Sequence, residues 1–314
     1  MRFSPYGIGF FDSGIGGLTV MAECRRYIKD ERFYYYGDNS RAPYGNRSQR
    51  KIKKYVNAAL KKFEKLNVRA VVLACNTATA VCIEELRKRY AFPIIGTEPA
   101  VNEAARAGGE VYVLATKATC ESARFQNLLS RTKARFPAAH LSSIPCVCLA
   151  GEIEKHIFDD SFEISSFLPK GEPNAVVLGC THYIYRKEAI ENFYHCPVYD
   201  GRKGIAKRLQ TILSQNLINN YTEIKQDNNQ NRDGRPLFRF LHKCVFSLTT
   251  RNPFTNKRKK TNECSRLFGG QNFEEKGEIV FLGSGKHKNK RVYERMFAFQ
   301  KVKSGQKSQK IKKN

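Results

Sequence analysis

The stretch Ala70-Val71-Val72-Leu73-Ala74-Cys75-Asn76-Thr77-Ala78-Thr79 decides the fold, because the chain repeats it further on as Ala175-Val176-Val177-Leu178-Gly179-Cys180-Thr181-His182. In both copies an aliphatic, β-branched run ends in a small residue and a cysteine. Such a run is typical of a strand that is buried on both faces of a parallel sheet. A helical pattern begins after each cysteine. Each cysteine is therefore predicted at the carboxyl end of a strand, where open α/β sheets bind their ligands.

Two cysteines in equivalent positions predict an active site with two thiols. A single cysteine after an apolar run is most often an inert buried residue, but the repeated sequence favours a paired site over that interpretation. A helix amino terminus offers free N–H groups and the positive end of the helix dipole, and both lower the pKa of a nearby thiol. Thiols on opposite faces of a bound α-carbon can remove and return its proton, which inverts that carbon.

The rest of the sequence alternates predicted strands and helices, which indicates the α/β class with mainly parallel sheets. The predicted strands are residues 8–11, 33–36, 70–74, 92–96, 111–115, 144–150, 174–179, 197–199 and 279–282. The predicted helices are residues 18–28, 48–66, 80–90, 121–129 and 204–213, with a last helical stretch that ends at 299. Within this pattern Cys146-Val147-Cys148 is interpreted as strand alternation and not as a zinc-binding pair.

A glycine-rich turn, Asp12-Ser13-Gly14-Ile15-Gly16-Gly17, joins the first strand to the first helix and predicts a cradle for an anion or an amino acid. A dinucleotide is not favoured, because Thr19 stands in place of the third glycine of that fingerprint. The sequence also lacks a phosphate loop, a pyridoxal-binding lysine signature and a cluster of metal ligands. We therefore expect neither a cofactor nor a metal.

The polar residues beside the cysteines supply the other groups of the predicted site. Asn76, Thr77 and Thr181 are placed in the sequence to donate hydrogen bonds to a substrate carboxylate. Asp12 and His182 are candidates to tune the two thiols or to hold a substrate ammonium group.

The composition predicts a cytoplasmic protein. No apolar run approaches the length that crosses a membrane, and the first residues lack the apolar core and cleavage site of a signal peptide. The ten cysteines are scattered through apolar segments of a chain of 314 residues. That distribution fits free thiols in a reducing compartment better than a disulfide scaffold.

Positive charge is concentrated in the C-terminal part of the chain. Of the net charge of +26, residues 216–314 carry +15 and residues 1–215 carry +11. Residues 220–276 are predicted to be a basic, polar, flexible insertion, and residues 301–314 a basic disordered tail. Such charge attracts nucleic acid, so a nucleic-acid-binding protein is the alternative from a different class. The region lacks a known DNA- or RNA-binding motif, which favours an accessory role at most.

Four motifs, found in order within residues 6 to about 215, resemble those of the glutamate racemases of the aspartate/glutamate racemase superfamily. They are Phe11-Asp12-Ser13-Gly14-Ile15-Gly16-Gly17, Gly37-Asp38-Asn39-Ser40-Arg41-Ala42-Pro43-Tyr44-Gly45, Ala74-Cys75-Asn76-Thr77-Ala78 and Gly179-Cys180-Thr181-His182-Tyr183. Residues 279–299 are similar to the strand, Ser-Gly turn and helix that close the family's first domain. The insertion at 220–276 departs from the family pattern, which leaves its role open.

The resemblance implies a fold of two similar, pseudo-symmetric α/β domains with the active site between them, often in a homodimer. We expect the first domain to comprise residues 1–97, 198–219 and 277–300, and the second to comprise 98–197. The implied activity is the cofactor-independent interconversion of L- and D-glutamate, which supplies D-glutamate for bacterial peptidoglycan. An aspartate racemase or a related two-cysteine racemase is the alternative, although the second motif of that group usually carries an acid where His182 stands.

The resemblance also implies roles for individual residues. Cys75 would take the α-proton of D-glutamate and Cys180 that of L-glutamate, with Asp12 and His182 assisting the two thiols. The residues implied to contact substrate are Asp12, Ser13, Tyr44, Gly45, Asn76, Thr77, Thr181 and His182. Thr116 and Thr119 match a family position near the substrate, and Glu154 matches a carboxylate near the second thiol.

Overall fold

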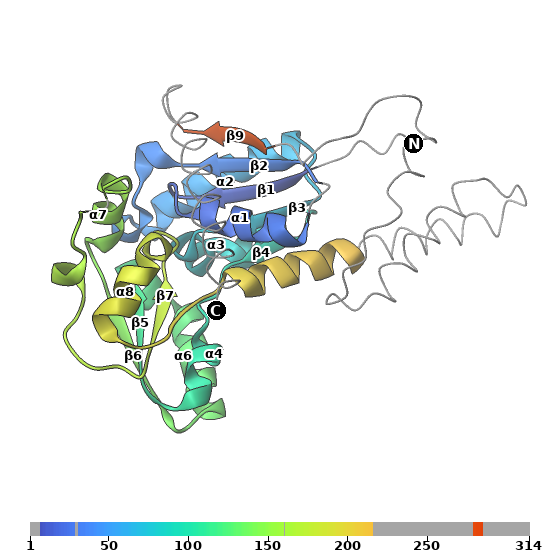
Figure 1. The fold of residues 1–314 in the computed structure, drawn as a ribbon. Coiled ribbons are helices and arrows are strands. Elements are labelled where there is room, and N and C mark those ends of the chain that lie inside the picture. Colours follow the sequence, from blue (N-terminus) through green and yellow to red (C-terminus); the bar gives the residue numbers. More distant parts are fainter. Residues whose placement is uncertain (1–6, 29–30, 160, 216–278, 285–314) are drawn as a thin grey trace, which may run out of the picture. The chain divides into compact units, whose positions relative to one another are not determined.

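A computed structural model describes residues 7–28, 31–159, 161–215 and 279–284, and the predicted α/β class with parallel sheets is confirmed (Figure 1). The first sheet has the order β4-β3-β1-β2-β9, and every pair in it is parallel. Its strands are β1 (Ile8–Asp12), β2 (Phe33–Gly37), β3 (Ala70–Leu73), β4 (Ile94–Gly96) and β9 (Ile279–Gly283). Its helices are α1 (Gly17–Tyr27), η1 (Asn39–Arg41), η2 (Tyr44–Asn46), α2 (Gln49–Lys65) and α3 (Asn76–Arg89).

The second sheet has the order β6-β5-β7-β8 and is also parallel throughout. Its strands are β5 (Gly109–Ala115), β6 (Ala139–Pro145), β7 (Ala175–Gly179) and β8 (Val198–Asp200). The accompanying helices are α4 (Val101–Ala104), η3 (Ala105–Ala107), α5 (Lys117–Cys120), α6 (Ala123–Arg135), α7 (Leu149–Lys155), η4 (Ser165–Phe167), η5 (Tyr183–Arg186) and α8 (Lys187–Tyr194).

The hydrophobic pattern explains which elements form the core. Every residue of β1, β2, β3 and β7 is buried, as continuous apolar runs require in a parallel sheet. Helix α2 buries Ile52, Val56 and Phe63 against the first sheet and leaves most of its lysines exposed. Its amphipathic face thus fixes it on the sheet, as the spacing predicts.

Strand register brings the functional residues to one edge of each sheet. In the first sheet Phe11 pairs with Leu73, so Asp12 and Cys75 follow at neighbouring strand ends. In the second sheet Ala115 pairs with Gly179, which sets Thr116 beside Cys180 in the same way. These carboxyl ends are where parallel sheets place ligands.

The predicted strand at 144–150 is wrong. The observed strand β6 ends at Pro145, and α7 already begins at Leu149. Strand β6 is an edge strand of half-exposed residues such as Ser142, so it lacks the apolar run that reveals a buried strand. Proline has no N–H to continue the ladder, which suits the end of an edge strand. Cys146 and Cys148 therefore do not alternate along a strand.

One domain boundary also differs from the expectation. The expected boundary assigns residues 198–219 to the first domain. Strand β8 pairs with β7, however, so Val198–Asp200 belongs to the second sheet. Strand β9 pairs with β2, which agrees with the expected closing strand of the first sheet. The predicted insertion at 220–276, the helical stretch up to 299 and the tail at 301–314 lie outside the described residues.

Residue contacts divide the chain into two units. Both sheets belong to one unit, Met1–Arg208 with Gly277–Asn314. The other unit is Leu209–Lys276, of which the structure describes only the helical residues 209–215. Over the described residues, every helix is too short or too polar to cross a bilayer.

Candidate active site

Cys75 lies between strand β3 and helix α3 and is the N-cap residue of that helix. Its backbone is extended, and its Sγ accepts a hydrogen bond from the Ala78 N–H at 3.4 Å. The thiol donates to Ser13 Oγ at 3.5 Å. The side chain is only 4% exposed. The first thiol therefore occupies the buried amino terminus that the sequence predicts.

The environment of Cys75 does not lower its pKa. Burial raises the pKa of this thiol to about 12, the Asp12 carboxylate and Cys180 add to the increase, and the hydrogen bonds with Ser13 and Ala78 oppose it. The expectation of a lowered pKa at the helix terminus is therefore wrong for this geometry, because desolvation of the thiolate outweighs the hydrogen bonds with Ser13 and with the Ala78 N–H of the helix terminus. Cys75 holds its proton at neutral pH.

Cys180 follows β7 and has a different neighbour. Its Sγ lies 3.8 Å from His182 Nδ1, and His182 Nε2 lies 2.8 Å from Glu154 Oε2 of helix α7. Burial opposes a charged imidazole, but the hydrogen bonds and charges of Cys180 and Glu154 outweigh it and hold the pKa of His182 well above its usual value. The second thiol thus faces an imidazolium. The turn that follows leads into the 3₁₀ helix η5, whereas Cys75 caps an α-helix.

Asp12 connects the strand ends of the two sheets. Its Oδ1 accepts from the Gly14 N–H at 2.9 Å, and its Oδ2 accepts from Thr181 Oγ1 at 3.1 Å. The carboxyl group is fully buried, and burial raises its pKa although His182 and these hydrogen bonds oppose the increase. One carboxyl group therefore joins the glycine turn after β1 to Thr181 of the second cysteine motif.

The loop after β2 adds Tyr44 and Gly45 to the site. The Tyr44 hydroxyl donates to Asp38 Oδ2 at 2.5 Å, and Arg41 Nη1 donates to the other Asp38 oxygen at 2.8 Å. Burial raises the pKa of Tyr44, and Asp38 and Cys75 add to the increase. A Cβ atom at Gly45 would lie 2.9 Å from the Thr116 Cβ, so only glycine allows this close approach.

Three threonine hydroxyls from both sheets meet beside this loop. Thr77 Oγ1 lies 2.9 Å from Thr116 Oγ1 and 3.4 Å from Thr119 Oγ1, and the last two are 3.0 Å apart. All three residues are buried. Asn76, the first residue of α3, is half-buried next to Thr77. This cluster offers hydroxyl donors for a carboxylate.

Three residues of the site have roles that the sequence does not predict. Asp38 belongs to a quoted motif, but its burial and its bond to Tyr44 follow only from the folded loop. The hydroxyls of Tyr35 and Tyr185 donate to the Gly14 and Ile15 carbonyls at 2.8 and 2.9 Å and hold the glycine turn. Tyr185 makes this contact across a long sequence separation, for which no spacing pattern exists. Within the described part of the chain no group of His, Cys, Asp and Glu side chains is arranged to hold a metal ion.

Residues 8–209 match the sequence model of the Asp/Glu/Hydantoin racemase family, so the chain belongs to this family of racemases. Among its similar relatives are glutamate racemases. That of Clostridium novyi is 37% identical over 72% of this chain and 90% of its own length. That of Halothermothrix orenii is 35% identical over 66% of this chain and 85% of its own length.

A solved structure agrees with this assignment. The Escherichia coli glutamate racemase, in complex with L-glutamate and the activator UDP-MurNAc-Ala, is 29% identical and superposes with a TM-score of 0.60. The match covers 67% of this chain and 82% of that protein. The expected two-domain α/β fold is therefore shared with a glutamate racemase.

Proposed function

We propose that this protein interconverts L- and D-glutamate with two thiols and supplies D-glutamate for cell-wall peptidoglycan. The observation that carries the proposal is the position of Cys75 and Cys180 after equivalent strands, beside one carboxyl group, Asp12, that is bonded to Thr181. Inversion of an α-carbon needs a proton acceptor on one face and a donor on the other. The glutamate racemases among its relatives support glutamate as the substrate.

In the direction from D to L, the Cys75 thiolate takes the α-proton of D-glutamate, and the electron pair stays on the α-carbon. The Cys180 thiol then donates its proton to the opposite face, which leaves L-glutamate and a Cys180 thiolate. The reverse direction begins with the Cys180 thiolate. One proton is lost and one gained at carbon in each direction. Buried hydrogen-bond donors stabilise the carbanion-like transition state.

The two thiols have different neighbours. Cys75, with its pKa of about 12, holds its proton, whereas Cys180 lies 3.8 Å from His182, whose pKa is raised by its contacts with Cys180 and Glu154. The Cys75 thiol is thus ready to donate its proton when L-glutamate binds. For D-glutamate the proton must first leave Cys75, and a substrate ammonium group close to the thiol would favour that step.

Substrate binding is proposed to use the residues that surround the thiols. Asp12 and Ser13, Tyr44 and Gly45, Asn76 and Thr77, and Thr181 and His182 would contact glutamate. The Thr77–Thr116–Thr119 hydroxyl cluster is suited to one of its carboxylates. The chemistry needs no cofactor, since the thiols and the fixed donors supply all the groups involved.

The direct test follows the circular dichroism of L-glutamate, and in parallel of L-aspartate, with the purified protein. Loss of the signal with L-glutamate is expected, and Cys75→Ala and Cys180→Ala should each abolish it, because neither thiol can replace the other. A signal lost only with L-aspartate would favour the alternative racemase. Unchanged signals with both amino acids would contradict the proposal.

The finer features of the protein are proposed from its composition and charge and, for the dimer, from the resemblance to its family. We propose a cytoplasmic homodimer, and nucleic-acid binding only as an accessory property of the basic C-terminal region. A gel shift with DNA at increasing salt, performed with and without residues 220–276, tests the second point. Retention of racemase activity without that segment would separate the two properties.

A further inference from the structure

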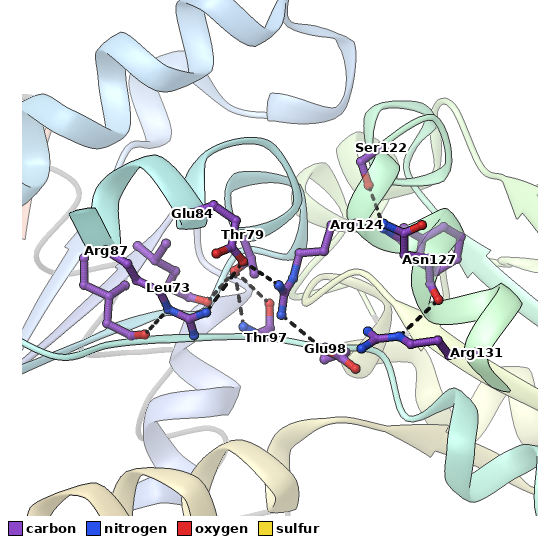
Figure 2. A network of polar contacts seen from close by, with 12 residues as sticks. Leu73, Thr79, Glu84, Arg87, Thr97, Glu98, Ser122, Arg124, Asn127 and Arg131 are labelled. Carbon is purple, nitrogen blue, oxygen red and sulfur yellow. Dashed lines mark hydrogen bonds and ion pairs between the residues drawn. The ribbon is translucent and has the colours of Figure 1, made fainter. Parts of the chain in front are cut away.

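Thr79 of helix α3 is bonded to the backbone of Leu73, just before the Ala74–Cys75 turn (Figure 2), and to the backbone of Cys75 itself. Its hydroxyl donates to the Leu73 carbonyl, the last of strand β3, at 3.1 Å. Its own N–H donates to the Cys75 carbonyl at 2.9 Å. One residue therefore fixes the chain immediately before and at the first thiol.

The Thr79 hydroxyl is itself held in a single orientation. The Thr97 N–H donates to Thr79 Oγ1 at 3.2 Å, and Thr97 Oγ1 lies 3.3 Å away. Because the single proton of the Thr79 hydroxyl goes to Leu73, the Thr97 hydroxyl must be the donor in the second contact. The Thr79 methyl lies against Gly96, where an added Cβ would come within 2.5 Å of it. Thr79, Thr97 and Leu73 are all buried.

Thr97 is also the first residue after β4, where the chain leaves the first sheet for α4. The next residue, Glu98, is bonded to Arg124 of helix α6, which also bonds Glu84 of α3 (Figure 2). The segment that holds Thr79 is thus anchored at two neighbouring residues. This makes Thr79 the link between a fixed crossover segment and the turn that carries Cys75.

We propose that Thr79 is a positioning residue that sets the place of the Cys75 thiol through the Leu73 and Cys75 carbonyls. The inference rests on the proposed role of Cys75. Within the described residues the thiol makes two hydrogen bonds, at 3.4 and 3.5 Å, and sulfur is a weak partner in both roles. Its position therefore depends on the backbone. Small displacements of a reacting group cost large factors in rate.

Kinetic constants alone cannot show which thiol is displaced. L- and D-glutamate have equal free energies in water, so any variant must lose kcat/KM by the same factor in both directions. Kinetic isotope effects separate the two proton transfers. Deuterium at the α-carbon of D-glutamate reports on removal by Cys75, and deuterium in L-glutamate reports on removal by Cys180.

The experiment compares Thr79→Val, which loses the hydroxyl at almost constant volume, with Thr79→Ser, which keeps it. In Thr79→Val we expect kcat/KM to fall by about tenfold or more. The isotope effect with α-deuterated D-glutamate should rise and that with α-deuterated L-glutamate should fall. Thr79→Ser should keep both isotope effects near those of the wild type. Thr132→Val is the matched control, because it removes another buried hydroxyl, bonded to Asn102 Oδ1 at 3.2 Å, far along the chain in α6.

A Thr79→Val variant with unchanged isotope effects would overturn the inference. A fall in its rate would not rescue the inference, because a smaller folded fraction lowers the rate without changing the isotope effects. If Thr79→Val does not fold, Thr79→Ala is measured at lower temperature with the same two substrates. Failure of both variants to fold would assign Thr79 to stability and also overturn the inference. A wild-type protein without racemase activity would instead overturn the proposed function. The failure of the inference is different, because it requires an active wild type and a Thr79 variant whose isotope effects do not change or that does not fold.

Discussion

At the scale of single residues, the two thiols have the same place in the sequence and different chemistry in the fold. Cys75 is the cap of a long α-helix with Ser13 and the Asp12 carboxyl group as neighbours. Cys180 faces the His182–Glu154 pair. The helix terminus alone does not activate the first thiol, because its burial raises the pKa. The titratable groups beside the two thiols therefore differ, although the two cysteines occupy equivalent positions in the sequence.

Replacement of Glu154 by glutamine should change the pH dependence of the reaction. The hydrogen bond and charge of Glu154 help to raise the pKa of His182, so Glu154→Gln should lower that pKa. Because the proposed reaction uses protonated His182 beside Cys180, the decline of kcat/KM at alkaline pH should begin at lower pH than in the wild type. Glu152→Gln, on the same helix and bonded to Lys155, is the control. If the alkaline decline of kcat/KM in Glu154→Gln begins at the same pH as in the wild type, or at higher pH, this role of Glu154 is contradicted.

At the scale of helices and strands, the elements with a strong periodic signal were predictable. The apolar runs of β3 and β7 and the amphipathic pattern of α2 match the structure. The helix after Cys75 begins at Asn76 and not at Ala80, because the cysteine itself is the cap. Strand β6 was misplaced because an edge strand with Ser142 and Ser143 has no apolar run. Edge strands carry the weakest sequence signal, since one side of each is solvated.

The contacts between elements could not be predicted in the same way. The Thr77–Thr116 and Thr181–Asp12 bonds join residues that are far apart in the chain. The hydrophobic period and the spacing of motifs describe only local structure. They therefore identify residues of the site, but not the residues to which these are hydrogen-bonded. The resemblance to a family predicts further residues of the site, including Glu154. It does not predict the roles of Asp38, Tyr185 or Thr79.

Two matched valine substitutions test the contribution of the closing strand. Val71 lies in β3 and is fully buried, whereas Val280 lies in the edge strand β9 and is only partly buried against the same core. Val71→Ala should lower the free energy of unfolding by about 2–3 kcal/mol, and Val280→Ala by about 1 kcal/mol or less. Urea unfolding curves measure both. A larger loss for Val280→Ala would mean that β9 stabilises the sheet more than its exposure indicates.

At the scale of the whole molecule, buried thiols make the stability depend on alkaline pH. Burial raises the pKa of Cys75, Cys82 and Cys146 to about 12 in each case. A pKa that is raised on folding stabilises the protein below the unfolded-state value, and this stabilisation is lost as the pH rises through the folded-state value. The free energy of unfolding should therefore fall above about pH 9.

Cys82→Ala should make that decline less steep. Each buried thiol contributes a slope of about 1.4 kcal/mol per pH unit in this range, and Cys82 lies outside the proposed catalytic groups. Urea unfolding between about pH 8.5 and 10.5, with a reductant present, measures the slope. Cys148→Ala is the control, because that thiol is exposed. Equal slopes for the wild type and Cys82→Ala would show that the Cys82 thiolate is not excluded from the folded state.

Racemisation of L-glutamate in D₂O shows whether two thiols act on opposite faces of one α-carbon. In the proposed mechanism Cys180 removes the α-proton, and the exchanged Cys75 thiol adds a deuteron. At low conversion the D-glutamate formed should therefore carry deuterium at the α-carbon, while the remaining L-glutamate should not. Proton NMR of the separated enantiomers measures both. Deuterium that enters the L-glutamate as fast as the product would show a single base and contradict the account.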